Sequence, residues 1–137
     1  MILVDTNVWS ELVRPEPDPH VVAWEAKNAA RLWLSSVVIG EFLSGVELMP
    51  EGRRKTALRE TYAEVIELYR DRIAPFELAD SQRYAEVLAK QERAGRNPGT
   101  ADTQIAATAL ARGMQLASRN TKHFAGLGLK LIDPWRA

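Results

Sequence analysis

The sequence contains no cysteine among its 137 residues. This absence excludes disulfides, iron–sulfur clusters and zinc sites built from thiolates. The sequence also lacks any apolar run near the ~20 residues that span a membrane. Its first residues lack the basic segment and the long apolar core of a secretory signal peptide. We therefore expect a cytoplasmic protein that does not associate with membranes.

An excess of charge of either sign is also missing, because 18 lysines and arginines balance 18 aspartates and glutamates. A strong overall positive field, which would attract nucleic acid from a distance, is thereby excluded. The basic residues are unequal in kind, with thirteen arginines and five lysines. Arginine binds phosphate through two parallel hydrogen bonds but also suits buried ion pairs, so this bias leaves both roles open.

Short apolar segments alternate along the chain with segments of helical spacing. The strand-like segments are residues 1–5, 31–35, 73–78, 115–118 and 129–132. The helix-like segments are residues 6–13, 20–30, 37–48, 53–70, 80–93 and 101–112, with a short helical turn at 121–124. This alternation predicts an α/β fold with a small, mostly parallel central sheet flanked by helices. The length suits a single domain that spans residues 1–137.

Polar residues that can accept backbone N–H groups predict where three of these helices begin. We expect Ser36, Asp80 and Thr100 to cap the segments that start at residues 37, 80 and 101. Gly113 stands where the last of them should end. Pro75 favours an edge position for the segment 73–78, because proline cannot donate a hydrogen bond to a neighbouring strand.

Asp5 follows directly on the apolar residues 2–4, at the carboxyl end of the first expected strand. In open α/β sheets this is the edge at which ligands bind. An aspartate here could instead cap the following helix, but Thr6 and Asn7 could each do the same. Because three caps are redundant, we interpret Asp5 as a ligand-binding carboxylate. Thr6 and Asn7 would then orient it or hold a water molecule.

Two further carboxylates lie far along the chain in apolar surroundings. On a helical wheel Glu41 lies outside the polar arc and between Val37 and Val38, where an uncompensated charge is costly. A glutamate on a solvated helix face is the common alternative. Asp102 lies in the first turn of an apolar helix, where the helix dipole alone favours an acid. The N-terminus of that helix should open at the same sheet edge as Asp5.

Three carboxylates without cysteine or clustered histidine favour a hard cation, Mg²⁺ or Mn²⁺, which prefers oxygen ligands. Such an ion can make a bound water more acidic and stabilise charge on phosphoryl oxygens. We therefore predict that Asp5, Glu41 and Asp102 hold a metal ion and that water hydrolyses a phosphodiester there. A domain that uses Asp5 as a phosphate-accepting nucleophile is a rival, disfavoured because no second aspartate adjoins Asp5.

Five segments in this order resemble the PIN-domain nucleases, and specifically the VapC-type toxins of bacterial toxin–antitoxin pairs. They are ILVDTNV at 2–8 with SE at 10–11, SSVVIGE at 35–41, DTQIAATA at 102–109, SRNTKHF at 118–124 and DPW at 133–135. The resemblance covers nearly the whole chain. It implies a metal-dependent endoribonuclease whose acidic Mg²⁺ site is Asp5, Glu41 and Asp102. It also implies a homodimer and inhibition by a cognate antitoxin protein.

The late segment departs from the family pattern at His123. Many relatives carry a fourth acid just before the phenylalanine, so the histidine here favours one metal ion over two. A plain surface residue is the alternative for His123. Ser118 and Asn120 are expected to line the pocket as hydrogen-bonding groups. The missing acid also leaves open a second function, a PIN-like domain that binds RNA or a protein without cutting.

Candidate RNA contacts are basic residues in the loops expected near the same sheet edge. They are Arg96, Arg119, Lys122 and Arg14. Solvated surface charge is the alternative for each of them.

Overall fold

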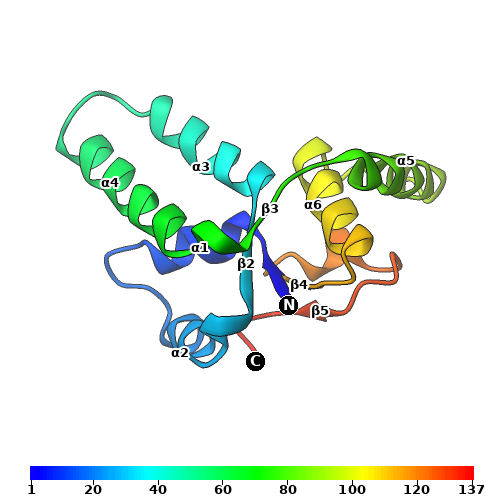
Figure 1. The fold of residues 1–137 in the computed structure, drawn as a ribbon, viewed down its shortest axis with the longest axis horizontal. Coiled ribbons are helices and arrows are strands. Elements are labelled where there is room, and N and C mark those ends of the chain that lie inside the picture. The colour runs from blue at the N-terminus through cyan, green and yellow to red at the C-terminus, as the bar shows by residue number, and fades with distance from the viewer.

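The computed structural model describes all of residues 1–137. Its five strands form one sheet in the order β3–β2–β1–β4–β5, and all four neighbouring pairs are parallel. Helices surround this sheet (Figure 1). The expected α/β fold with a small parallel sheet flanked by helices is confirmed.

Every expected segment occurs, with ends that shift by a few residues. The strands are β1 (Ile2–Val4), β2 (Leu32–Ser35), β3 (Ile73–Ala74), β4 (Gln115–Ala117) and β5 (Leu131–Ile132). The α-helices are α1 (Thr6–Leu12), α2 (Pro19–Asn28), α3 (Ser36–Glu47), α4 (Arg53–Leu68), α5 (Leu78–Arg93) and α6 (Thr100–Ala111). Three 3-10 helices are η1 (Ala29–Arg31), η2 (Arg70–Arg72) and η3 (Thr121–Phe124). None of the helices has both the length and the apolar character needed to cross a membrane.

The first strand, β1, lies at the centre of the sheet. Ile2, Leu3 and Val4 are all buried, as expected for a short run without polar alternation. Leu3 lies opposite Trp33 of β2 on one side and Leu116 of β4 on the other. The chain builds β2 and β3 on one side of β1, then crosses over to build β4 and β5 on the other.

Four of the six α-helices form two pairs that are separated by the strands. Figure 1 shows α3 and α4 to the left of the strands and α5 and α6 to the right. Phe42 of α3 stacks on Tyr62 of α4 with ring centroids 4.3 Å apart. Trp9 of α1 meets the edge of Tyr69, which follows α4, at 5.1 Å. These aromatic contacts join α1, α3 and α4 into one apolar core.

The expected cap of α3 is wrong by one residue. Ser35, not Ser36, precedes the helix, and its Oγ accepts the Val37 N–H at 3.0 Å. Ser35 is also the last residue of β2, where it pairs with Ala74 of β3. The end of this strand pairing therefore decides which of two adjacent serines caps the helix.

The edge position predicted for the Pro75 segment is confirmed, since β3 is an outer strand that ends at Ala74.

The expected caps of α5 and α6 also differ from the structure. Asp80 is the third residue of α5, and its buried Oδ2 accepts the N–H of Glu77, the residue before the helix, at 2.7 Å. Thr100 is the first residue of α6, and Gly99 precedes it with a φ of +99°. Both corrections are shifts of position within the helix start.

Candidate active site at the carboxyl edge of the sheet

The strand order fixes where a site can form. β1 and β4 are neighbours at the point where the chain changes the direction in which it adds strands. In open parallel sheets a crevice opens there, beyond the carboxyl ends of the strands. Asp5 follows β1 and Ser118 follows β4, so both residues lie at this crevice.

Asp5 is buried and held by three hydrogen-bond donors. Its Oδ1 accepts the Thr6 N–H at 2.8 Å, which makes Asp5 the N-cap of α1. Its Oδ2 accepts from Ser118 Oγ at 2.7 Å and from Asn7 Nδ2 at 3.2 Å. The capping role and the binding role, weighed as rivals from the sequence, are therefore compatible, because each uses a different oxygen.

Burial raises the pKa of the Asp5 carboxyl above its ordinary value, because the charged form loses contact with water. Hydrogen bonds from Ser118 and Thr6 oppose this effect and lower the pKa. The negative charges of Asp102 and Glu41 raise it further. Asp5 therefore lies close enough to Asp102 and to Glu41 to be affected by the negative charge of each.

Glu41 reaches the site from the second turn of α3. It is half-buried, and its Oε1 accepts a short hydrogen bond from Thr6 Oγ1. The position of Glu41 off the solvated face of α3, predicted from the helical wheel, is confirmed. Thr6 thus links two of the three candidate carboxylates, since its backbone contacts Asp5 and its hydroxyl contacts Glu41.

Asp102 reaches the site from the first turn of α6, as expected. Its Oδ2 lies 3.1 Å from Nδ1 of His123 in η3. His123 is exposed, as the surface alternative expected, but it also contacts one of the three acids. The sequence could not show this contact, because tertiary packing sets the orientation of η3.

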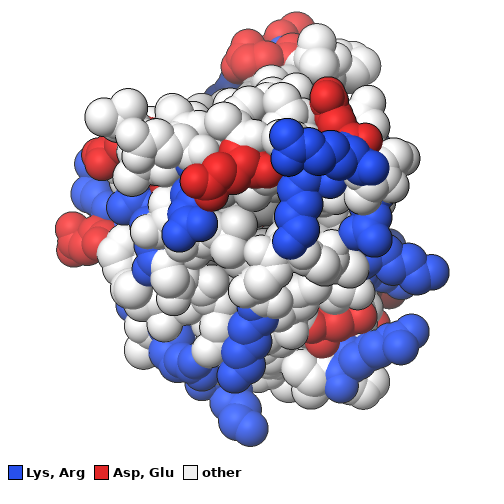
Figure 2. Space-filling model, turned by 90° about the vertical axis from the view of Figure 1, so that its right-hand side faces the viewer, with Lys and Arg blue, Asp and Glu red and all other residues white.

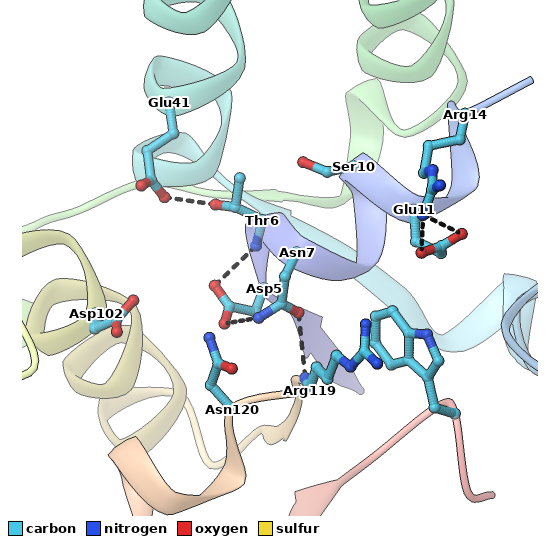
Figure 3. A pocket seen from close by; sticks show the side chains of 11 residues that line it. Asp5, Thr6, Asn7, Ser10, Glu11, Arg14, Glu41, Asp102, Arg119 and Asn120 are labelled. Carbon is cyan, nitrogen blue, oxygen red and sulfur yellow. Dashed lines mark hydrogen bonds and ion pairs between the residues drawn. The ribbon is translucent and has the colours of Figure 1, made fainter. Parts of the chain in front are cut away.

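The three carboxylates line one open pocket of about 460 Å³. Figure 3 shows Asp5 at the start of α1, Glu41 on α3 and Asp102 on α6 around this space. The residues that line the pocket are Asp5, Thr6, Asn7, Ser10, Glu11, Arg14, Glu41, Asp102, Arg119, Asn120 and Trp135. We call this space the acidic pocket.

The donor set suits a hard cation, but its atoms are not assembled around one point. Three carboxylates that line one pocket offer oxygen ligands and negative charge, as Mg²⁺ and Mn²⁺ require. However, no group of three or more His, Asp or Glu side chains is arranged so that it could hold a metal ion. Glu41 is turned to Thr6 and Asp102 to His123. A cation bound by all three acids would therefore require side-chain rotation.

The structure brings together most of the other predicted site residues. Thr6, Asn7 and Asn120 line the acidic pocket, whereas Ser118 lies buried behind Asp5. Among the candidate RNA contacts, Arg14 and Arg119 line the pocket. Lys122 lines a neighbouring pocket.

Arg96 lies outside both pockets. Its guanidinium donates to the carbonyl of Ala125, which follows η3, at 2.8 Å. The Arg96 guanidinium therefore has a hydrogen-bond partner within the protein and lines neither of the pockets at which RNA contacts were expected.

Glu11 lines the acidic pocket, although the sequence analysis did not select it as a site residue. It is buried, and Oε1 lies 3.1 Å from Nη1 of Arg14. Its Oε2 accepts the Asp18 N–H at 3.0 Å, which ties α1 to the start of α2. The sequence signal that could have identified Glu11 as a site residue is its place directly after Ser10, in the first segment that resembles the PIN-domain nucleases.

Comparisons with known proteins agree on one family. A family model described as PIN domain matches residues 2–128. Plasmid stability protein StbB of Pseudomonas syringae pv. tomato is 42% identical over the full length of both chains. VapC ribonuclease Y4jK of Sinorhizobium fredii is 41% identical over 98% of each chain. Toxin FitB of Neisseria gonorrhoeae is 34% identical over 98% of this chain and 99% of its own.

A solved structure shows the same architecture. The crystal structure of FitAcB from Neisseria gonorrhoeae superposes with a TM-score of 0.91 at 34% identity, over 100% of both chains.

Proposed function

The chain belongs to the PIN domain family, and from this premise we propose that it is a metal-dependent endoribonuclease that acts as the toxin of a toxin–antitoxin pair. Relatives named VapC ribonuclease and Toxin FitB, similar over nearly the whole chain, support this assignment. The observation that carries it is the convergence of Asp5, Glu41 and Asp102, from three separate elements, on one open pocket.

The residues of the acidic pocket differ in how firmly they are held. Asp5 is fixed by three donors, whereas Glu41 and Asp102 each have one side-chain partner. Asp5 would therefore fix the position of a cation, and the other two would complete its ligands by rotating. When bound, Mg²⁺ or Mn²⁺ would make a water more acidic and stabilise negative charge on the phosphate.

The basic residues of the acidic pocket would hold the RNA. Arg119 and Arg14 lie on its rim, where a guanidinium can donate two hydrogen bonds to phosphate oxygens. Asn120 and Asn7 add neutral hydrogen-bonding groups. The acids and the bases of the pocket thus have separate tasks, since the acids bind the cation and the bases bind the substrate.

The decisive experiment is cleavage of RNA by the purified chain. We expect cleavage of single-stranded or looped RNA in Mg²⁺ or Mn²⁺, complete loss in excess chelator and recovery when metal is restored. Asp5→Asn and Asp102→Asn should each reduce the rate by more than the ~10–100-fold typical of residues that only support a metal ligand. Asp71→Asn, at an exposed acid in η2, is the matched control and should cleave normally. Undiminished cleavage in chelator would refute the metal-dependent mechanism.

A domain that binds RNA or a protein without cutting is the second candidate. It is favoured by His123 in place of a fourth acid and by a pocket whose acids are not assembled around one point. Such a domain would bind RNA equally well with and without Asp102, and no fragments would accumulate with any divalent metal. The same Asp102→Asn and Asp71→Asn pair therefore separates the two functions.

We also propose a cognate antitoxin as partner and a homodimer as the assembly. A groove of about 310 Å³ adjoins the acidic pocket and shares Ser10 and Arg14 with it. Four of the residues that line this groove are hydrophobic, and Arg54 adds a charge to its rim. This groove, which we call the α1–α4 groove, suits an inserted apolar segment of the antitoxin, whose own arginine could then reach the acids.

A further inference from the structure

A second pocket lies against the acidic pocket. It has a volume of about 370 Å³, and no hydrophobic residue lines it. Arg119 and Asn120 line both pockets and so form the wall between them. The remaining lining residues are Thr121, Lys122, His123, Asp133 and Arg136. We call this space the basic pocket.

The basic pocket has an excess of positive charge. Arg119, Lys122 and Arg136 face one acid, Asp133. Asp133 lies 3.7 Å from Nε of Arg136, and the Arg136 side chain is 88% exposed. Arg119 and Lys122 form no ion pair with any acid of the chain, so their donors are free for an anion. On the face shown in Figure 2, lysines and arginines are mixed with acidic side chains, so that face as a whole carries no uniform positive charge.

The wall between the two pockets is held in place by the residues around Asp5. The backbone N–H of Arg119 donates to Oδ1 of Asn7 at 3.2 Å, and that of Asn120 donates to Oγ of Ser118 at 3.0 Å. The Arg119 guanidinium lies over the ring of Trp135 at 4.9 Å. Such stacking limits the orientations of the guanidinium and leaves its edge free to donate hydrogen bonds.

A strand of RNA that places one phosphate among the carboxylates must carry the next phosphate out of the acidic pocket. Like charge at the acids disfavours every phosphate that no cation neutralises. The basic pocket offers the opposite charge directly across the shared wall of Arg119 and Asn120. Its polar lining also suits a phosphate better than a base, which would need an apolar or aromatic surface to stack on.

We propose that the basic pocket binds an RNA phosphate that neighbours the phosphodiester held at the acidic pocket, through Lys122 and Arg136 with Arg119 between the two pockets. This inference rests on the proposed function, because it takes RNA as the occupant of the acidic pocket. It assigns to Arg136, which the sequence did not single out, a direct contact with the substrate.

The test measures binding of a single-stranded RNA oligonucleotide to the full chain in an Asp5→Asn background. Lys122→Gln with Arg136→Gln should weaken binding about tenfold or more at low salt. The dependence of log K on log salt should become shallower by about 0.7 for each lost phosphate contact. Arg93→Gln with Lys130→Gln is the matched control, because it removes the same charge from two exposed residues that line neither pocket. The control should bind within about threefold of its parent.

Equal weakening by both pairs of substitutions, or no weakening by Lys122→Gln with Arg136→Gln, would overturn the inference. Failure of the parent to bind RNA at all would also overturn it. Cleavage by the unmodified chain is measured separately. If that chain cleaves RNA while the pocket substitutions leave binding unchanged, only this inference fails. If it does not cleave but binding depends on the basic pocket, only the proposed activity fails. Thermal unfolding of each variant confirms that the fold is intact.

Discussion

Asp5 combines two tasks within one side chain. Oδ1 caps α1, and Oδ2 accepts from Ser118 and Asn7, whose donors come from either end of the chain. A carboxylate held at both oxygens cannot rotate freely, so its position depends on the residues that hold it. The geometry of the site therefore depends on neutral neighbours as well as on the acids themselves.

Removal of the Ser118 hydroxyl tests this dependence. In Ser118→Ala, Asp5 loses its 2.7 Å donor and Asn120 N–H loses its acceptor. Residues that orient a metal ligand typically contribute ~10–100-fold to metal affinity or activity, so we expect a loss of that size in Mn²⁺ affinity measured by calorimetry. Ser44→Ala, at an exposed serine of α3, is the control and should bind Mn²⁺ normally. Equal affinity of the two variants would show that Ser118 does not position Asp5.

That the three acids line one pocket was predictable, because Asp5 follows an apolar strand, Glu41 lies off the polar arc of its helix and Asp102 begins a helix that opens at the same sheet edge. Ser118 and Asn120 were predicted at the pocket, but not the bond from Ser118 to Asp5 across 113 positions. The contact of His123 with Asp102 was missed for the same reason. Which side chains meet across the crevice depends on strand register and loop orientation, and neither is visible in local sequence.

At the scale of whole elements, helix ends show what decides local structure. The sequence placed six helices and five strands correctly but chose Ser36 over Ser35 and Asp80 over Glu77 as caps. Ser35 and Ser36 are adjacent and have the same intrinsic capping strength. The choice between them is made by the preceding strand, such as the pairing of Ser35 with Ala74, which is a tertiary contact.

Gly113, which follows α6, and Gly45, inside α3, should respond in opposite ways to substitution by alanine. Gly113 ends α6 with a φ of +64°, where a Cβ costs about 1–2 kcal/mol. Gly45 lies inside α3, where alanine gains about 0.5–1 kcal/mol. An added Cβ meets no atom within 4 Å at either position, so the difference isolates the backbone. Urea unfolding should show Gly113→Ala destabilised and Gly45→Ala stabilised; the same sign for both would contradict this account.

Tyr69 links the end of α4 to α2 through a hydrogen bond from its hydroxyl to Glu25 at 3.1 Å. Burial, with the negative charge of Glu25 and this bond, raises the pKa of Tyr69 from 10.0 to about 12. The neutral phenol is therefore favoured in the fold, and its stabilisation is complete below pH 10 and is lost as pH rises through 12. Tyr69→Phe should lose about 0.5–1.5 kcal/mol near neutral pH.

Unfolding in urea at a series of pH values measures this effect. The free energy of unfolding should fall between pH 10 and 12 in the parent protein and fall less steeply in Tyr69→Phe. Tyr84→Phe provides a second tyrosine for comparison, at a half-buried position on α5. Identical pH dependence of the parent and Tyr69→Phe would show that Tyr69 does not make this contribution.

At the scale of the whole molecule, the acidic pocket and the α1–α4 groove are separate surfaces that meet at Ser10 and Arg14. Ala57 is exposed and lines the groove but not the acidic pocket. Ala57→Glu should therefore keep RNA cleavage but escape inhibition by the antitoxin, because a charge opposes an apolar segment in the groove. Co-expression with the antitoxin, scored by cell growth and by complex formation, measures this. Normal inhibition would place the antitoxin elsewhere.

Self-association is the second expectation at this scale. Leu48, Leu68 and Leu78 are 73–86% exposed, at the ends of α3 and α4 and the start of α5. Burial of such side chains against a second copy of the chain would remove apolar surface from water. Sedimentation of the purified chain at micromolar concentration should show a dimer, and a monomer at that concentration would contradict the expectation.

The central strand β1 pairs with β4, which is made long after it. The N–H of Asp5 donates to the carbonyl of Ala117 at 2.9 Å, and Ser118 follows in the same stretch. Until residues 117 and 118 have been made, Asp5 lacks both its backbone partner and the Ser118 hydroxyl. Until residue 123 has been made, Asp102 lacks its contact with His123. Under the proposed function, a growing polypeptide would thus stay harmless to its own messenger and to the translation machinery around it. Activity would begin only after β4 and Ser118 have been made and have folded beside β1, which gives a neutralising partner time to arrive.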